Sequence, residues 1–189
     1  MKNLLKILLL SIFSTVTAYA QTDSIATDTT VYTQSDSIAT NAKVFAVHDG
    51  DSYKIKFDTS TTNTFVWVRL YAADCPEVYS PYVRKTQIFG REAGDHVREK
   101  IKGECVYVVP MYADIYDRMV AKIYVNGKDL SEYLIENGYA WFYDPGKEMP
   151  KEEREKLKEL QKNAKKQKLG LWGQKGIKVS PWTFRKRNV

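Results

Sequence analysis

Five short apolar runs lie between residues 44 and 125, and turn residues separate them. The runs are rich in β-branched and aromatic side chains, which favours strands over helices. They cover residues 44–47, 53–57, 65–71, 105–109 and 119–125. The middle of the chain is therefore predicted to be built from strands.

The third run is the most informative because its polarity alternates. One face would carry Val66, Val68 and Leu70, and the other Phe65, Trp67, Arg69 and Tyr71. Since successive side chains of a strand point to opposite sides of a sheet, we expect the aliphatic set to face a core. Arg69 then points the other way, between two aromatic side chains, which indicates a site or a groove.

Three segments have helical spacing instead. Residues 87–101 carry Ile88 and other apolar residues between charged positions, residues 129–137 form a shorter helix, and residues 152–168 form a longer basic one. One helix after the third strand and two after the fifth predict an α+β fold. We expect a five-stranded β-barrel of the OB type with three α-helices.

The first twenty residues have the pattern of a secretory signal peptide. Lys2 and Lys6 make a basic start, residues 7–16 are mostly apolar, and Ala18-Tyr19-Ala20 is a small-residue cleavage site. The apolar stretch is short for a membrane span, and no cysteine follows it to carry a lipid, so we expect no membrane anchor. Residues 1–20 thus predict export, to the periplasm or out of the cell.

Residues 21–42 are rich in serine, threonine and aspartate, and the pentapeptide Asp-Ser-Ile-Ala-Thr occurs in them twice. Such a segment buries too little apolar surface to offset the entropy lost on ordering, so we expect a flexible linker. A single domain is expected at residues 43–185, followed by a tail at 186–189. The basic residues 181–189 are expected to wrap the surface or fray.

Charge and cysteine content change this picture only slightly. The formal net charge is +6 at pH 7, which suits a polyanionic partner without requiring one. Cys75 and Cys105 belong to a chain expected to be exported, so a disulfide and two free, largely buried thiols both stay open. Their spacing does not fit a zinc site.

Six acids and two arginines carry the candidate chemistry. They stand in the segments Asp49-Gly50-Asp51, Val68-Arg69-Leu70, Asp74-Cys75-Pro76-Glu77 and Asp114-Ile115-Tyr116-Asp117-Arg118. Two carboxylates can hold a hard cation while a third acts as a base, and two guanidiniums can hold a phosphate and the charge that develops on it. This set suits metal-assisted cleavage of a phosphodiester.

Each segment alone has a simpler interpretation. The Asp-Gly-Asp triplet is typical of a solvated hairpin turn, Arg69 of an exposed strand face and Arg118 of a charged hairpin. Their joint occurrence favours a site. The sequence has no EF-hand, Walker or serine-hydrolase motif, which argues against a calcium sensor, a nucleoside triphosphatase and a serine hydrolase. His48 and His96 are isolated, so a nuclease with a histidine-bound metal is not supported either.

From about Lys43 to Arg185 the chain resembles the staphylococcal nuclease (thermonuclease) family. The motifs occur in the family's order: Asp49-Gly50-Asp51-Ser52, Val68-Arg69-Leu70, Asp74-x-Pro76-Glu77, Phe89-Gly90-x-Glu92-Ala93, Asp114-x-Tyr116-x-Arg118, Asn137-Gly138-x-Ala140, Gly170-Leu171-Trp172 and Pro181-Trp182-x-Phe184-Arg185. Each is weak alone, whereas the ordered set is specific. The resemblance implies an OB-fold barrel with three helices and a calcium-dependent nuclease that cuts DNA and RNA with little sequence preference.

The resemblance also implies the metal ligands and the base. Asp51, Asp74 and the backbone carbonyl of Cys75 would bind Ca²⁺, and Glu77 would be the general base. The family usually has threonine where Cys75 stands, and a backbone ligand survives that change. Cleavage on the 5′-oxygen side would leave 3′-phosphates.

Two arginines and a tyrosine are assigned to the substrate in the same way. Arg69 and Arg118 would hold the scissile phosphate, and Tyr116 would contact the terminal phosphate region of the nucleotide.

The chain departs from the family at two neighbouring positions. Asp117 replaces a common glycine, and aspartate tolerates a positive φ better than most residues. Ile115 replaces a common lysine, which removes one phosphate contact.

An aromatic cluster precedes the turn that begins at Asp144, and it comprises Tyr139, Trp141, Phe142 and Tyr143. Aromatic side chains at a barrel rim can stack on bases without reading sequence, so Tyr143 is a candidate substrate-binding residue. Trp141 and Phe142 equally suit a core beneath the last predicted helix. The basic run at residues 151–168 suits a solvated helix face.

The sequence thus predicts a secreted, calcium-dependent, sugar-nonspecific nuclease, a monomer that hydrolyses DNA and RNA. The alternative is a non-catalytic module of the same fold that binds nucleic acid or protein. Such a module would be expected to have lost the base or an arginine. A third interpretation, a calcium-stabilised structural domain, does not explain the two arginines.

Overall fold

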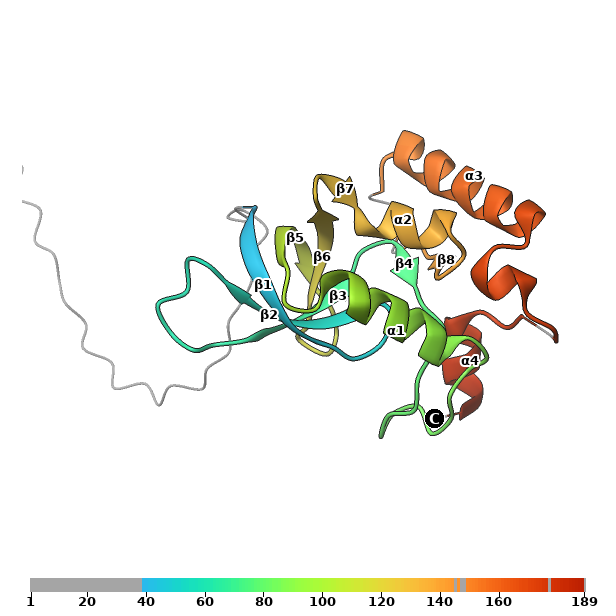
Figure 1. Cartoon of the computed structure of the whole chain (residues 1–189), viewed down its shortest axis with the longest axis horizontal. Coiled ribbons are helices and arrows are strands. Elements are labelled where there is room, and N and C mark those ends of the chain that lie inside the picture. Colours follow the sequence, from blue (N-terminus) through green and yellow to red (C-terminus); the bar gives the residue numbers. More distant parts are fainter. Residues whose placement is uncertain (1–38, 145, 147–148, 177, 189) are drawn as a thin grey trace, which may run out of the picture. The chain divides into compact units, whose positions relative to one another are not determined.

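The computed structural model describes residues 39–144, 146, 149–176 and 178–188 (Figure 1). The expected signal peptide, and the expected linker up to residue 38, lie outside the described residues. The strands are β1 (Thr40–Val47), β2 (Ser52–Phe57), β3 (Val66–Leu70), β4 (Ala73–Asp74), β5 (Cys105–Ala113), β6 (Met119–Val125), β7 (Lys128–Asp129) and β8 (Trp141–Phe142). The helices are α1 (Gly90–Ile101), α2 (Leu130–Glu136), α3 (Lys151–Gln167), α4 (Pro181–Asn188) and the short 3-10 helix η1 (Gly170–Gly173).

Five of the strands close into a barrel. The sheet runs in the order β3-β2-β1-β5-β6-β7, and a parallel pairing of β3 with β6 joins the two sides. In that pairing Arg69 of β3 lies opposite Val120 of β6. The predicted five-stranded barrel of the OB type is therefore confirmed. A second, two-stranded sheet pairs β4 with β8 and holds Asp74 opposite Trp141.

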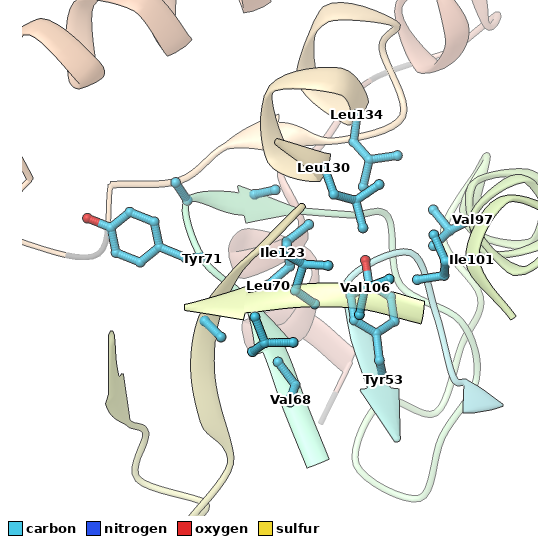
Figure 2. Packing of buried hydrophobic residues seen from close by; sticks show 14 of the residues in the cluster. Tyr53, Val68, Leu70, Tyr71, Val97, Ile101, Val106, Ile123, Leu130 and Leu134 are labelled. Atoms are coloured by element: carbon cyan, nitrogen blue, oxygen red, sulfur yellow. The ribbon is translucent and has the colours of Figure 1, made fainter. Parts of the chain in front are cut away.

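The core follows the alternation expected of β3. Val68 is fully buried and Leu70 is buried, while Arg69 between them points out of the core. Figure 2 shows these two residues packed with Tyr53 of β2 and with side chains that α1 and α2 supply, namely Val97, Ile101, Leu130 and Leu134. Side chains of α1 and α2 thus complete the core of the barrel.

The expectation for Tyr71 was wrong. This residue is 4% exposed and belongs to the core instead of sharing a face with Arg69. The strand ends at Leu70, and Ala72 adopts a positive φ of 61°. Because the backbone turns there, the strand alternation stops before Tyr71.

The three expected helices are present, with shifted starts. α1 begins at Gly90 instead of residue 87, after Phe89 with its positive φ of 69°, so Ile88 precedes the helix and is 60% exposed. Asp129 caps α2 by accepting hydrogen bonds from the N–H groups of Ser131 and Glu132. No helix among the described residues is long and apolar enough to cross a membrane.

A fourth helix, α4, was not expected, and the expectation of a fraying or wrapping segment was wrong for residues 181–188. Pro181 is its first residue, a position where the missing N–H is not needed. Ser180 Oγ donates to Thr183 Oγ1 at 2.8 Å across the first turn. The indole of Trp182 packs against Trp141 with ring centroids 5.8 Å apart, which holds the helix on the domain.

Candidate functional site

The barrel brings four of the predicted site residues together. Asp51 ends the β1–β2 turn, Arg69 is the fourth residue of β3, and the register places Arg69 opposite Ser52, the next residue after Asp51. Asp74 lies in β4, and Glu77 lies in the loop that follows. Strand pairing of β2 with β3 therefore brings Asp51 to the short segment that carries Arg69, Asp74 and Glu77.

Asp51 is held from both sides and is buried at 5% exposure. Its Oδ2 accepts a hydrogen bond from the Cys75 N–H at 2.5 Å, and its Oδ1 forms an ion pair with Arg69 Nη1. The Asp51 N–H in turn donates to Asp49 Oδ1 at 3.1 Å. A solvated hairpin turn, the simpler interpretation of this triplet, does not fit because both aspartates are buried.

The Arg69 guanidinium bridges two carboxylates. One terminal nitrogen pairs with Asp51, and the other, Nη2, donates to Asp74 Oδ1 at 2.5 Å. Burial by itself would lower the pKa of Arg69, but the charges of Asp51 and Asp74 outweigh it and raise that pKa. Arg69 is thus a fixed cation between the two aspartates.

The pKa values of the two aspartates in the turn shift in opposite directions. Burial and the neighbouring charge of Asp51 raise the pKa of Asp49. Burial also acts to raise the pKa of Asp51, but the Arg69 charge and the Cys75 N–H offset it, and the pKa ends below its ordinary value. Arg69 and the Cys75 N–H therefore favour the ionised form of Asp51 more than that of Asp49, which makes Asp51 the better cation ligand.

Glu77 has the properties of a base that works near neutral pH. Burial first, and then the charge of Asp51, raise the pKa of Glu77 to about 7, although Arg185 opposes the shift. Two hydrogen bonds fix its backbone, because the Gln87 N–H donates to the Glu77 carbonyl at 2.8 Å and the Glu77 N–H donates to Gln87 Oε1 at 3.2 Å. Its carboxylate lies beside Asp74, because Arg185 Nη1 contacts an oxygen of each.

Arg118 reaches the cluster from the turn between β5 and β6. Asp114 organises this turn, since its Oδ1 accepts from the N–H groups of Tyr116 and Arg118 and its Oδ2 accepts from Arg118 Nε at 2.9 Å. Arg118 Nη1 then donates to Ser52 Oγ at 3.3 Å. The arginine therefore lies next to Asp51 without pairing with it, and Tyr116 is exposed beside its guanidinium.

The two departures from the family pattern lie on the same turn. Asp117 has a positive φ of 56°, so this position does require the conformation for which glycine is suited. Ile115 is 90% exposed, so its side chain lies in solvent. Neither residue disturbs the contacts of Arg118.

The aromatic cluster divides between core and surface. Tyr143 is 40% exposed, and its ring lies 6.0 Å from that of Trp182 on α4. Trp141 is half-buried against Trp172, with ring centroids 4.5 Å apart. Tyr143 thus lies where Trp182 of α4 packs on the domain, and it is not one of the residues that contact the carboxylates.

Sequence reasoning missed one member of the cluster. Arg185 of α4 donates to Asp74 Oδ1 at 2.9 Å and to Asp74 Oδ2 at 3.2 Å, and its Nη1 also pairs with Glu77 Oε1. The residue was visible at the end of the motif that begins at Pro181. Its neighbours Lys186 and Arg187 are also cations, so composition alone does not select it.

The cysteines are free in the structure, with Cys75 buried and Cys105 exposed. The disulfide that the sequence left open is not formed, and of the two thiols only that of Cys75 is buried. Burial, together with the charges of Asp51 and Asp49, raises the pKa of Cys75. A neutral thiol is a poor ligand, so Cys75 can contribute its carbonyl oxygen and not its sulfur.

The oxygen donors fit a hard divalent cation such as Ca²⁺. One guanidinium spans Asp51 and Asp74, so these carboxylates lie close enough to share a single positive centre. Within the described ranges no three side chains of the His, Cys, Asp or Glu type are arranged as a complete metal site. Two protein carboxylates and a carbonyl would therefore need water or substrate oxygens to complete the coordination.

Comparisons with known proteins identify the family to which the chain is similar. Residues 67–174 match the family described as Staphylococcal nuclease homologue. The chain is 32% identical to Staphylococcal-like nuclease CAN1 of Arabidopsis thaliana over 119 residues, which is 63% of this chain and 33% of that protein. It is 34% identical to Probable endonuclease LCL3 of Komagataella phaffii over 116 residues, which is 59% of this chain and 50% of that protein.

The chain spans at most half the length of these relatives. The family match alone covers more than half of the 189 residues and contains Arg69, Asp74, Glu77 and Arg118. The chain belongs to the staphylococcal nuclease homologue family.

Proposed function

We propose that this chain is an exported, calcium-dependent nuclease that hydrolyses phosphodiester bonds in DNA and RNA. The observation that carries the proposal is the position of Glu77, a largely buried carboxylate with a pKa of about 7 beside Asp74 and within one cluster with Arg69. A base with such a pKa accepts a proton readily near neutral pH and releases it again after the reaction.

The roles follow from the contacts of each group. Glu77 Oε1 pairs with Arg185, and we assign Oε2 to take the proton of the attacking water. Arg69 and Arg118 are the cations proposed to bind the phosphate, because a guanidinium stays charged and can hold two phosphate oxygens. Water attacks phosphorus, the bond to the 5′ oxygen breaks, and the leaving oxygen takes a proton from solvent, which leaves a 3′-phosphate.

Asp51, Asp74 and the Cys75 carbonyl would hold the calcium ion. The ion would supply positive charge that stabilises the phosphate during attack. Asp49 would position Asp51, since its carboxylate accepts a hydrogen bond from the Asp51 N–H. Tyr116 and Tyr143 are both exposed and are proposed to contact the nucleotide, Tyr116 beside Arg118 and Tyr143 beside Trp182.

Export is the other part of the proposal. It rests on the basic start, the apolar stretch and the small-residue site within residues 1–20. The expected location is the periplasm or the medium. Detection of full activity only in the cytoplasmic fraction of expressing cells would contradict it.

Digestion of plasmid and single-stranded nucleic acid tests the activity. The purified protein is assayed in calcium and in excess chelator, beside Glu77→Gln and the control Glu92→Gln, which alters an exposed acid on α1. We expect cutting that needs calcium, that the control retains, and that Glu77→Gln lowers by about 100-fold or more.

Two results would contradict the proposal in different ways. Cutting that survives Glu77→Gln would remove Glu77 from the mechanism. Binding of nucleic acid without cutting by the unaltered protein would favour the non-catalytic module.

A further inference from the structure

Arg185 comes to the cluster from beyond residues 67–174, the segment that the family model matches, although the ordered motifs extend as far as Arg185. The match ends at residue 174, and Arg185 lies on α4 beyond it. Its guanidinium nevertheless makes a two-pronged contact with Asp74, at 2.9 Å to Oδ1 and 3.2 Å to Oδ2, and also pairs with Glu77. One side chain thus contacts both a proposed calcium ligand and the proposed base.

The buried Asp74 carboxylate needs a partner of opposite charge. Its side chain has no solvent exposure, and a buried carboxylate is costly unless a cation or hydrogen bonds compensate it. Oδ1 accepts from both Arg69 and Arg185, while Oδ2 accepts from Arg185. The two arginines therefore provide charge compensation that a bound cation could also provide.

Of the two arginines, Arg185 is the one that can leave. Its side chain is 35% exposed, against 13% for Arg69, which also pairs with Asp51. Arg185 reaches Asp74 from a short helix at the surface, whereas Arg69 is part of the barrel.

The helix is held by contacts that do not involve Arg185. Trp182 packs on Trp141, and the Arg84 N–H donates to the Asn188 carbonyl at 3.2 Å. Gln87 Nε2 also donates to the Val179 carbonyl just before the helix. Substitution of Arg185 therefore removes the guanidinium from the cluster and leaves α4 docked.

We propose that Arg185 is a tethered counter-cation, which holds Asp74 and Glu77 in place without metal and competes with calcium for Asp74. The inference rests on the proposed calcium-dependent nuclease. It makes Arg185 a positioning residue that the metal displaces. Calcium binding would free the guanidinium from Asp74 while the helix stays in place.

Calcium titration of the full chain by calorimetry tests the inference. Arg185→Gln removes the charge, Arg185→Lys retains it, and Lys186→Gln removes the neighbouring exposed charge as a control. Because a like charge near the ion is lost, Arg185→Gln is expected to bind calcium about tenfold more tightly. Arg185→Lys and Lys186→Gln are expected to bind close to the unaltered protein.

Melting in excess chelator supplies a second readout. Arg185→Gln is expected to melt at a lower temperature than the unaltered protein in chelator, and the difference should shrink in saturating calcium. Weaker calcium binding by Arg185→Gln is what a merely structural role predicts, and it would overturn the inference. Equal calcium affinity in all variants would overturn the role of Arg185 and leave the proposed calcium site standing. If neither the unaltered protein nor any variant binds calcium, both the proposed calcium site and this inference are overturned.

Discussion

Glu77 faces two opposing requirements. As the proposed base it must be ionised, while its burial favours the protonated form and raises its pKa from 4.5 to about 7. Between these two values the folded state keeps a proton that the unfolded state has released. The free energy of unfolding therefore falls as pH rises through this window, and the loss is complete above pH 7.

Glu77→Gln removes this penalty because the amide does not ionise. In chelator at pH 8 the variant is expected to be more stable than the unaltered protein by about 1–3 kcal/mol. At pH 4.5 the difference should nearly vanish, since both side chains are then neutral. Urea unfolding at the two pH values measures it, and a variant less stable at pH 8 would show that the ion pair with Arg185 outweighs burial.

At Asp117 the effect of backbone conformation can be measured separately from the effect of the side-chain charge. Its positive φ of 56° suits glycine, so Asp117→Gly is expected to raise the free energy of unfolding by about 0.5–1 kcal/mol. Asp117→Asn keeps the tolerance for this conformation and removes the charge beside Arg118. Both variants should have a lower KM for oligonucleotides, whereas only the glycine variant should be more stable. An unchanged KM in both would mean that the Asp117 charge does not reach the substrate.

At the scale of elements, the start of α1 fixes the loop that carries Glu77. Gly90 is buried, and a Cβ there would collide with the Glu77 carbonyl. Four residues later, a Cβ on Gly94 would lie 3.6 Å from Asp49 Cα, an ordinary contact. Of these two glycines of one helix, Gly90 is therefore the one whose surroundings exclude a side chain.

Gly90→Ala and Gly94→Ala form a matched pair. Gly90→Ala is expected to destabilise the protein by about 1–3 kcal/mol and to lower kcat, because the helix start and the Glu77 backbone must move apart. Gly94→Ala is expected to be neutral or to stabilise by up to about 1 kcal/mol, since alanine favours helix. Thermal unfolding and single-turnover cleavage measure the two effects. Equal behaviour of the variants would contradict the role given to Gly90.

For the molecule as a whole, sequence predicted what depends on local pattern. The alternation of Val68, Arg69 and Leu70 correctly predicted a core face and an outward arginine. It failed at Tyr71, because the positive φ of Ala72 ends the strand and residue types alone do not signal it.

Non-local contacts explain the rest of the difference. The motifs in order predicted Asp51, Asp74 and Glu77, and the barrel brings them together. They did not predict that Asp74 would be shared by Arg69 and Arg185, since the second contact depends on how α4 docks. Helix docking depends on packing such as that of Trp182 on Trp141, which no short window of sequence contains.

The parallel pairing of β3 with β6 has a consequence for how the chain folds. It joins the strand of Arg69 to the strand that begins directly after Arg118, and the two are far apart in sequence. Pairings of this kind form late because a long loop must first be closed. Until the ladder forms, Arg69 and Arg118, the two arginines proposed to bind phosphate, belong to separate segments. Recovery of cleavage during refolding therefore reports closure of the barrel, and not the formation of any single strand.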